Sequence, residues 1–295
     1  MSVPVAYFGI ILIWSTTPLT LQWSTQGMNF SFAVLARMVI GLVTSILILV
    51  IGRTRFPLHS RALLAYTVGG VGLFTSMALT YWGARFVHSG LIAVMFGLAP
   101  LMAGIMAAFL LGERALTYWK TLGTLLGVAG LGIIFLQGSR LGGESFLAGL
   151  TALVFSVFFY SVNLVWLKRI ADDSPPLATT VGSMAIATPL FALLWLSTDG
   201  AFPASVPLRS GAAIVYLGVF GSAIAFTMYY YVIKHMGATK VSLITLITPV
   251  LTLLLGNLLN GEHITPTLMS GTALILLGLA AHQRDALRQL LRQYL

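Results

Sequence analysis

Ten apolar runs of 17 to 24 residues follow one another along the chain, separated by short segments rich in glycine, proline and charge. They cover residues 4–24, 31–51, 62–84, 88–111, 117–136, 146–167, 177–197, 211–233, 239–260 and 266–282. About 20 apolar residues in a helix span a bilayer core roughly 30 Å thick. Backbone groups find no partners in lipid, so each run must bond internally as a helix. The pattern predicts an all-α integral membrane protein with ten transmembrane helices.

The composition supports this interpretation. The chain is 58% hydrophobic and 8% charged, with a mean hydropathy of +0.96, whereas soluble domains carry about 25% charged residues. It has no cysteine, which excludes disulfides and thiolate chemistry. The first residues, Met1 to Pro4, lack the basic region of a secretion signal, so we expect the first run to be retained as a membrane span.

The net charge of +9 is spread between the apolar runs and is not gathered in one patch. This distribution favours contact with anionic lipid over nucleic acid. Twelve Lys and Arg residues fall on the side that holds both termini and three fall on the other. By the positive-inside rule, both termini are predicted to be cytoplasmic in a multi-pass inner (cell) membrane protein.

The segment after the last run carries its charge on one face. Residues 283–295 place Arg284, Arg288 and Arg292 on one side of a helix and leucines on the other. This predicts a basic amphipathic tail lying on the cytoplasmic membrane surface. A plain solvated tail is the alternative.

A weak internal repeat runs through the chain. A shift of 149 residues superposes Gly112-Glu113 on Gly261-Glu262 and Pro100 on Pro249, together with three other pairs: Gly69 with Gly218, Gly72 with Gly221 and Tyr81 with Tyr230. The shift moves each helix five places along. Five is odd, so the two copies must cross the membrane in opposite directions. We expect inverted five-helix repeats at 1–136 and 144–282 with a linker at 137–143 and a substrate site between them near the midplane. Chance matching in a leucine-rich chain is the alternative.

The chain resembles the drug/metabolite transporter superfamily. The resemblance lies in Ala99-Pro100 through Gly112-Glu113, echoed by Thr248-Pro249 through Gly261-Glu262, and in Trp14-Ser15 and Arg37. It is closer to the EamA-type members and, through its length and its aromatic-rich first, third and sixth spans, to the YddG group of amino-acid exporters. In one respect the chain departs from the pattern, because the seventh span has no counterpart of Arg37.

The resemblance implies a secondary transporter that exports amino acids, aromatic and others, and related small metabolites by alternating access. A channel-like facilitator and a carrier of another metabolite class, such as nucleotide sugars, remain as alternatives. The substrate and the lipid bilayer are the partners implied. The sequence predicts no oligomeric state.

Polar and small residues form stripes beside the two repeated prolines. In the ninth span the stripe is Ser242, Thr245, Thr248 and Thr252, and its counterpart in the fourth span is Ala93, Phe96, Ala99 and Ala103. Each stripe lies beside a proline that leaves a backbone carbonyl without its helical partner. Facing stripes of this kind predict a cavity. Ordinary packing between membrane helices is the alternative.

Aromatic residues near the expected midplane form the second candidate feature, because aromatic faces bind ammonium groups and aromatic side chains. For any single aromatic, lipid contact or core packing is the alternative. Together, stripes and aromatics give the predicted substrate-binding set: Trp14, Tyr81, Phe96, Pro100, Tyr160, Tyr230, Thr245, Thr248 and Pro249.

Three charged residues are predicted to have structural or gating roles. Arg37 is the deepest charge; we expect it to lock its helix to a neighbour, with snorkelling to the headgroups and binding of a substrate carboxylate as alternatives. Glu113 and Glu262 each follow a glycine at the end of a span. They are expected to cap the free N–H groups at the start of the next helices, 117–136 and 266–282.

Other chemistry is not indicated. The sequence shows no metal-ligand spacing, no phosphate-binding glycine loop and no paired catalytic acid and base, so we predict no enzymatic activity, no metal and no cofactor. No carboxylate lies mid-span, where proton-coupled carriers commonly hold one. The sequence therefore favours facilitated export down the substrate gradient over proton antiport.

Overall fold

In the computed structural model the described residues are 2–111, 117–141, 143–198, 200–236 and 244–284. They form helices and connecting turns and contain no strand. Eight segments are long and apolar enough to cross a membrane, and two further apolar helices have 17 residues each. The prediction of an all-α membrane protein is confirmed.

The helices follow the apolar runs closely. Their bounds are α1 Val3–Ser24, α2 Phe30–Ile51, α3 Ser60–Gly83, α4 Ser89–Phe96, α5 Ala99–Leu111, α6 Tyr118–Leu141, α7 Gly143–Ile170, α8 Pro176–Thr198, α9 Leu208–Tyr216, the π-helix η1 Leu217–Ile224, α10 Ala225–Met236, α12 Ile244–Asn260 and α13 Pro266–His282.

Two of the expected spans are not regular α-helices. The run 88–111 breaks at the turn Gly97-Leu98, where α4 ends and α5 begins. Pro100 explains the break because it has no N–H to donate to the carbonyl four residues earlier. The run 211–233 contains η1, in which the Ser222 hydroxyl donates to the carbonyl of Leu217 at 3.0 Å. Short π-helical segments are frequent at functional sites.

The predicted linker 137–143 is mostly helical. α6 continues to Leu141 and α7 begins at Gly143, so the two helices occupy most of this segment. Polar residues alone did not end α6, because helix propensity tolerates Gln and Arg well.

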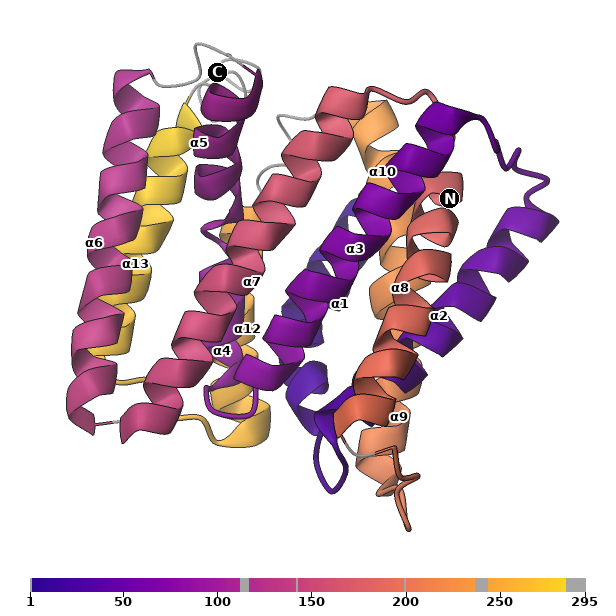
Figure 1. The fold of residues 1–295 in the computed structure, drawn as a ribbon. Helices are drawn as coiled ribbons and strands as arrows, with labels where there is room; N and C mark the ends of the chain where they lie inside the picture. Colours follow the sequence, from indigo (N-terminus) through magenta and orange to yellow (C-terminus); the bar gives the residue numbers. More distant parts are fainter. Residues whose placement is uncertain (1, 112–116, 142, 199, 237–243, 285–295) are drawn as a thin grey trace.

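The helices stand side by side, with α6 at one edge of the molecule and α2 at the other (Figure 1). α6 packs along α13, and small residues make this contact close: a Cβ added to Gly278 would meet the carbonyl of Gly123. Small residues allow such close approach between membrane helices. In the middle, α3 packs on α7 and α8, α1 packs on α10 and α12, and α4 packs on α12.

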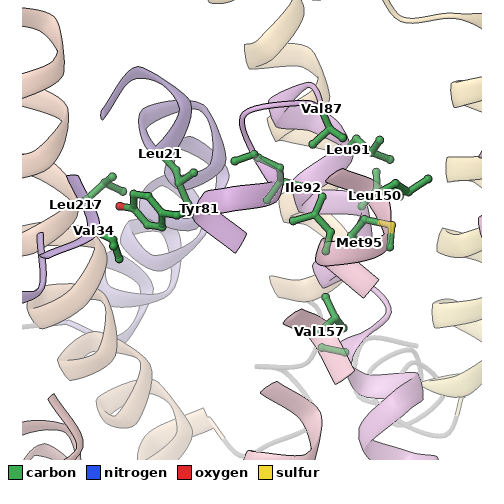
Figure 2. Packing of buried hydrophobic residues seen from close by; sticks show 14 of the residues in the cluster. Leu21, Val34, Tyr81, Val87, Leu91, Ile92, Met95, Leu150, Val157 and Leu217 are labelled. Carbon is green, nitrogen blue, oxygen red and sulfur yellow. The ribbon is translucent and has the colours of Figure 1, made fainter. Parts of the chain in front are cut away.

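The main buried core contains residues from helices of both the first half and the second half of the chain. Figure 2 shows Tyr81 among Leu21, Val34 and Leu217, which come from three different helices. A second group surrounds α4, where Ile92 and Met95 meet residues of α7. Tyr81 is fully buried; a buried tyrosine hydroxyl requires a hydrogen-bond partner, and that partner is Arg37.

Candidate functional site

A cavity of about 450 Å³ lies among the central helices, within the range of about 300–1,000 Å³ typical of small-molecule sites. The residues that line it come from α1, α2, α3, α4, α5, α7, η1, α10 and α12, and from the residue that follows α13. No described residue of α6 or α13 is among those that line it. The cavity is therefore central, and the α6–α13 pair stays outside it.

Six of the nine predicted substrate-binding residues line this cavity: Trp14, Phe96, Pro100, Tyr160, Thr245 and Thr248. Pro249 does not; it is buried against Gly97. Tyr81 lies behind the wall, with its hydroxyl bonded to Arg37. The side chain of Tyr230 lies outside the described residues, and its neighbour Tyr229 lines the cavity.

The aromatic lining forms two groups. Trp14 of α1 lies against Tyr229 and Phe226 of α10, with ring centroids 5.1 and 6.4 Å apart. Phe96 of α4 meets Tyr160 of α7 edge to face at 5.8 Å. Aromatic faces on a cavity wall suit an apolar or aromatic side chain of a ligand.

The two predicted stripes differ in how many of their residues line the cavity. All four members of the fourth-span stripe, Ala93, Phe96, Ala99 and Ala103, line the cavity. In the ninth span Thr245 and Thr248 line it and Ser242 lies outside the described residues. The prediction was wrong for Thr252, which does not line the cavity. It is fully buried, and its hydroxyl donates to the carbonyl of Ser15 at 2.8 Å. α1 and α12 are so close at this point that the threonine serves packing.

Arg37 lies on the cavity wall and is only 3% exposed. Its Nε donates to the Ser222 hydroxyl at 3.3 Å and its Nη1 to the Tyr81 hydroxyl at 3.4 Å. These contacts connect α2 to η1 and α3. Burial excludes the snorkelling alternative, which needs the guanidinium at the surface of the helix bundle.

Glu262 is the buried acidic residue of the described part of the chain, and it is 7% exposed. Its carboxylate accepts from the backbone N–H groups of Ser89 and Gly90 at 3.1 and 3.3 Å and from the Ser89 hydroxyl at 2.9 Å. Asn260 donates a further bond at 3.0 Å. Glu262 thus caps α4, not α13 as expected from its position in the sequence. α13 is capped by Thr265, whose hydroxyl accepts from the N–H of Leu268.

Glu113, the repeat partner of Glu262, lies outside the described residues, so the structure places only one of the two glutamates.

Several cavity residues were not in the predicted set, among them Thr17, Thr80, Gly221 and Gln283. Gly221 had one signal in the sequence, the repeat match with Gly72. The sequence predicts Gln283 to lie in the surface tail, yet it is 8% exposed and its side-chain amide donates to the Thr245 hydroxyl at 3.2 Å. The side-chain amide oxygen of Gln283, Oε1, has no hydrogen-bond partner in the described part of the chain.

The described residues contain no group of three or more His, Cys, Asp or Glu side chains that could hold a metal ion. The described lining of the cavity carries aromatic rings, hydroxyls, one side-chain amide and one guanidinium. Groups of this kind can hold a small molecule through shape and hydrogen bonds.

Comparison with known proteins identifies the family. The model of the EamA-like transporter family matches this chain twice, over residues 3–136 and 147–281. The chain belongs to the EamA-like transporter family. Membership supports the drug/metabolite transporter resemblance and makes the protein a multi-pass membrane transporter of small molecules, whereas the YddG group is only a loose likeness.

Individual relatives are distant. An uncharacterized transporter of Archaeoglobus fulgidus is 26% identical over 215 residues, covering 72% of this chain and 75% of the relative. A probable terminal-alkyne amino-acid exporter of Streptantibioticus cattleyicolor is 24% identical over 221 residues, with coverage of 74% and 72%. One solved crystal structure superposes with a TM-score of 0.65 at 25% identity and covers 98% of both chains.

Proposed function

We propose that this protein is a secondary carrier that exports amino acids, aromatic and others, and related small metabolites across the cell membrane by alternating access. The single observation that carries the proposal is the central cavity of about 450 Å³, lined by two aromatic groups and by Arg37. The family supplies the transport activity. One relative, named as a probable amino-acid exporter, supports the substrate class.

Alternating access requires two halves, and the packing supports an inverted repeat. The repeat relates each span to the span five later in the chain. It pairs α1 with α7, α2 with α8, and α3 with the segment α9–η1–α10. The contact of α3 with α7 then corresponds to that of α10 with α1, and the contact of α3 with α8 to that of η1 with α2. The pairs α2–α8 and α6–α13 each correspond to themselves. This exchange is what a twofold-related repeat produces.

The glycines of the repeat support the same relation. A Cβ at Gly69 would meet Ser183 of α8, and a Cβ at Gly218 would meet Ile40 of α2. The two glycines are 149 residues apart, and each holds a helix close to the corresponding partner in the other half.

Hydrogen bonds connect the helices at the end of the bundle where α1 and α12 end and α4 begins. There the Trp23 indole of α1 donates to Asn260 of α12 at 3.2 Å, and Glu262 holds the start of α4. By the distribution of Lys and Arg this end faces outside. We infer that these contacts close the outer route, and that their release opens it during export.

The test is counterflow in proteoliposomes. Vesicles preloaded with unlabelled L-phenylalanine should take up labelled L-phenylalanine transiently and saturably. No carboxylate is among the described residues that line the cavity, so an imposed pH gradient with equal substrate on both sides should drive no net accumulation. Linear uptake without counterflow identifies a channel-like facilitator. Counterflow with nucleotide sugars but not amino acids identifies a carrier of that class.

A further inference from the structure

In the described part of the chain, Arg37 meets hydroxyls and the ring of Tyr81, whose centroid is 5.9 Å from Cζ, but no opposite charge. A guanidinium has five N–H donors and is always ionised. Burying an ion without a partner is costly, so buried charges are normally paired. Among the residues that the structure describes, no carboxylate forms an ion pair with Arg37, and its two hydrogen bonds go to neutral hydroxyls. At 3.3 and 3.4 Å they are longer than the typical value of about 2.9 Å.

The neighbouring helices hold the guanidinium in one place. The Ser222 hydroxyl donates to the Leu217 carbonyl within η1, which leaves its oxygen free to accept from Arg37 Nε. Tyr81 is fully buried and fixes Nη1 from α3. The group is therefore positioned before any ligand arrives, and the ordering cost of binding is reduced.

The remaining donors lie beside the cavity. Gly221 lines it, and the point that a Cβ of Gly221 would occupy is 3.7 Å from both Arg37 Nη2 and the Thr17 hydroxyl. Arg37 and Thr17 are thus neighbours on the same wall. The Thr17 hydroxyl donates to the Ile13 carbonyl at 2.7 Å, so toward a ligand it acts as an acceptor. The positively charged guanidinium can donate to the α-carboxylate of an amino acid, and the neighbouring Thr17 hydroxyl can accept from its α-ammonium group.

The site is asymmetric between the two halves. A shift of 149 residues from Arg37 leads to Ile186 of α8, which has no charge. A purely structural lock in a twofold arrangement has no reason to be charged on one side alone, whereas a single carboxylate needs a single guanidinium.

We propose that Arg37 binds the carboxylate of the transported molecule, with Ser222 and Tyr81 as its positioning residues. This deepens the proposed amino-acid export and rests on it. A guanidinium binds a carboxylate through two parallel bonds, and such charged hydrogen bonds are stronger than neutral ones. The aromatic groups around Trp14 and Phe96 then receive the side chain.

The experiment measures competition against labelled L-phenylalanine with purified protein. Its probes are L-phenylalanine, 3-phenylpropionate, which keeps the carboxylate alone, and 2-phenylethylamine, which keeps the ammonium alone. We expect Arg37→Gln to weaken L-phenylalanine and 3-phenylpropionate about tenfold to a hundredfold and to leave 2-phenylethylamine unchanged. The exposed Arg85 gives the matched control Arg85→Gln, which should change nothing.

The outcomes separate the two proposals. Equal loss of all three probes in Arg37→Gln, or unchanged L-phenylalanine binding, overturns the carboxylate role and leaves amino-acid export standing. If Arg37→Gln does not fold, Arg37→Lys replaces it; it keeps the charge without the planar fork and should weaken the two carboxylates alone. Wild-type protein that binds 2-phenylethylamine as tightly as L-phenylalanine also overturns the role. Wild-type protein that binds none of the probes overturns both proposals.

Discussion

Arg37 and Glu262 are the two charged residues that are buried in the described part of the chain, and their surroundings differ. Glu262 accepts four hydrogen bonds at the end of α12, two of them from the start of α4 backbone. Arg37 donates two long bonds to neutral hydroxyls and faces a cavity. The carboxylate is satisfied by the fold; the guanidinium is only oriented by it. We therefore assign a structural role to the completed charge of Glu262, and our proposal gives the remaining donors of Arg37 to the ligand.

The largest expected effect is on stability at the Glu262 end. Glu262→Ala leaves the N–H groups of Ser89 and Gly90 without an acceptor in an apolar setting. We expect a loss of about 2–3 kcal/mol in unfolding free energy, seen as a lower melting temperature in detergent. The exposed Glu144 provides the control Glu144→Ala, which should melt like wild type. Unchanged melting together with lost substrate binding would reverse the assignment of the two charges.

The next effect is on affinity at the cavity side. Trp14→Ala removes the ring that meets Tyr229 and Phe226. We expect affinity for L-phenylalanine to fall about tenfold, while affinity for alanine changes little, because only an aromatic ligand loses a stacking partner. Binding to the purified variant measures this. Trp82 lies outside the cavity lining, so Trp82→Ala serves as control; an equal loss there would show that the effect is not local to the cavity.

A smaller effect is expected from the positioning residue. Ser222→Ala removes the acceptor of Arg37 Nε, a neutral partner with a net contribution of about 0.5–1.5 kcal/mol. We expect carboxylate affinity to fall a few-fold and 2-phenylethylamine to be unaffected. The Thr227 hydroxyl of α10 donates to the Ala223 carbonyl within its own helix, and Thr227→Ala is the matched loss of a hydroxyl. A change in melting temperature without a change in carboxylate affinity would assign Ser222 to packing alone.

The smallest effect concerns a charge at the bundle end, where solvent screens it. Ser174, whose backbone N–H donates to Oδ2 at 3.1 Å, and His59, 2.7 Å from Oδ1, hold the pKa of Asp172 below its ordinary value of 3.8. A lowered folded-state pKa gives stability that is present above about pH 4 and is lost as the pH falls through the folded pKa. Melting between pH 3 and 6 should show this acid loss, and Asp172→Asn should flatten it.

Much of the helical architecture was predictable because hydropathy is a local property. Each span had to be apolar along its whole length to lie in lipid, so its position could be read from the run itself. The same holds for the break after α4, which Pro100 imposes on its own turn, although the length of the run 88–111 predicts one continuous helix. The end of α6 was missed because nothing in residues 137–141 opposes a helix strongly enough to stop it.

The candidate site was predictable only in part. Trp14, Phe96 and Thr248 were found because polar and aromatic residues near a mid-span proline are rare enough to notice. Thr252 and Thr248 are one turn apart and look equivalent in the sequence. Only the approach of α1 to α12 gives them different roles.

The sequence by itself determined that this chain is a helical membrane protein with one deep arginine and glutamates at helix ends. Tertiary structure decided what those charges do. Glu262 meets Ser89 across 173 residues, and Arg37 meets Tyr81 across 44 and Ser222 across 185. Periodicity shows which residues share a helix face but not which helix that face meets, since rotation and packing of the helices set the partner. The difference between a carboxylate that accepts four hydrogen bonds and a guanidinium that donates two to neutral hydroxyls exists only once the helices are packed.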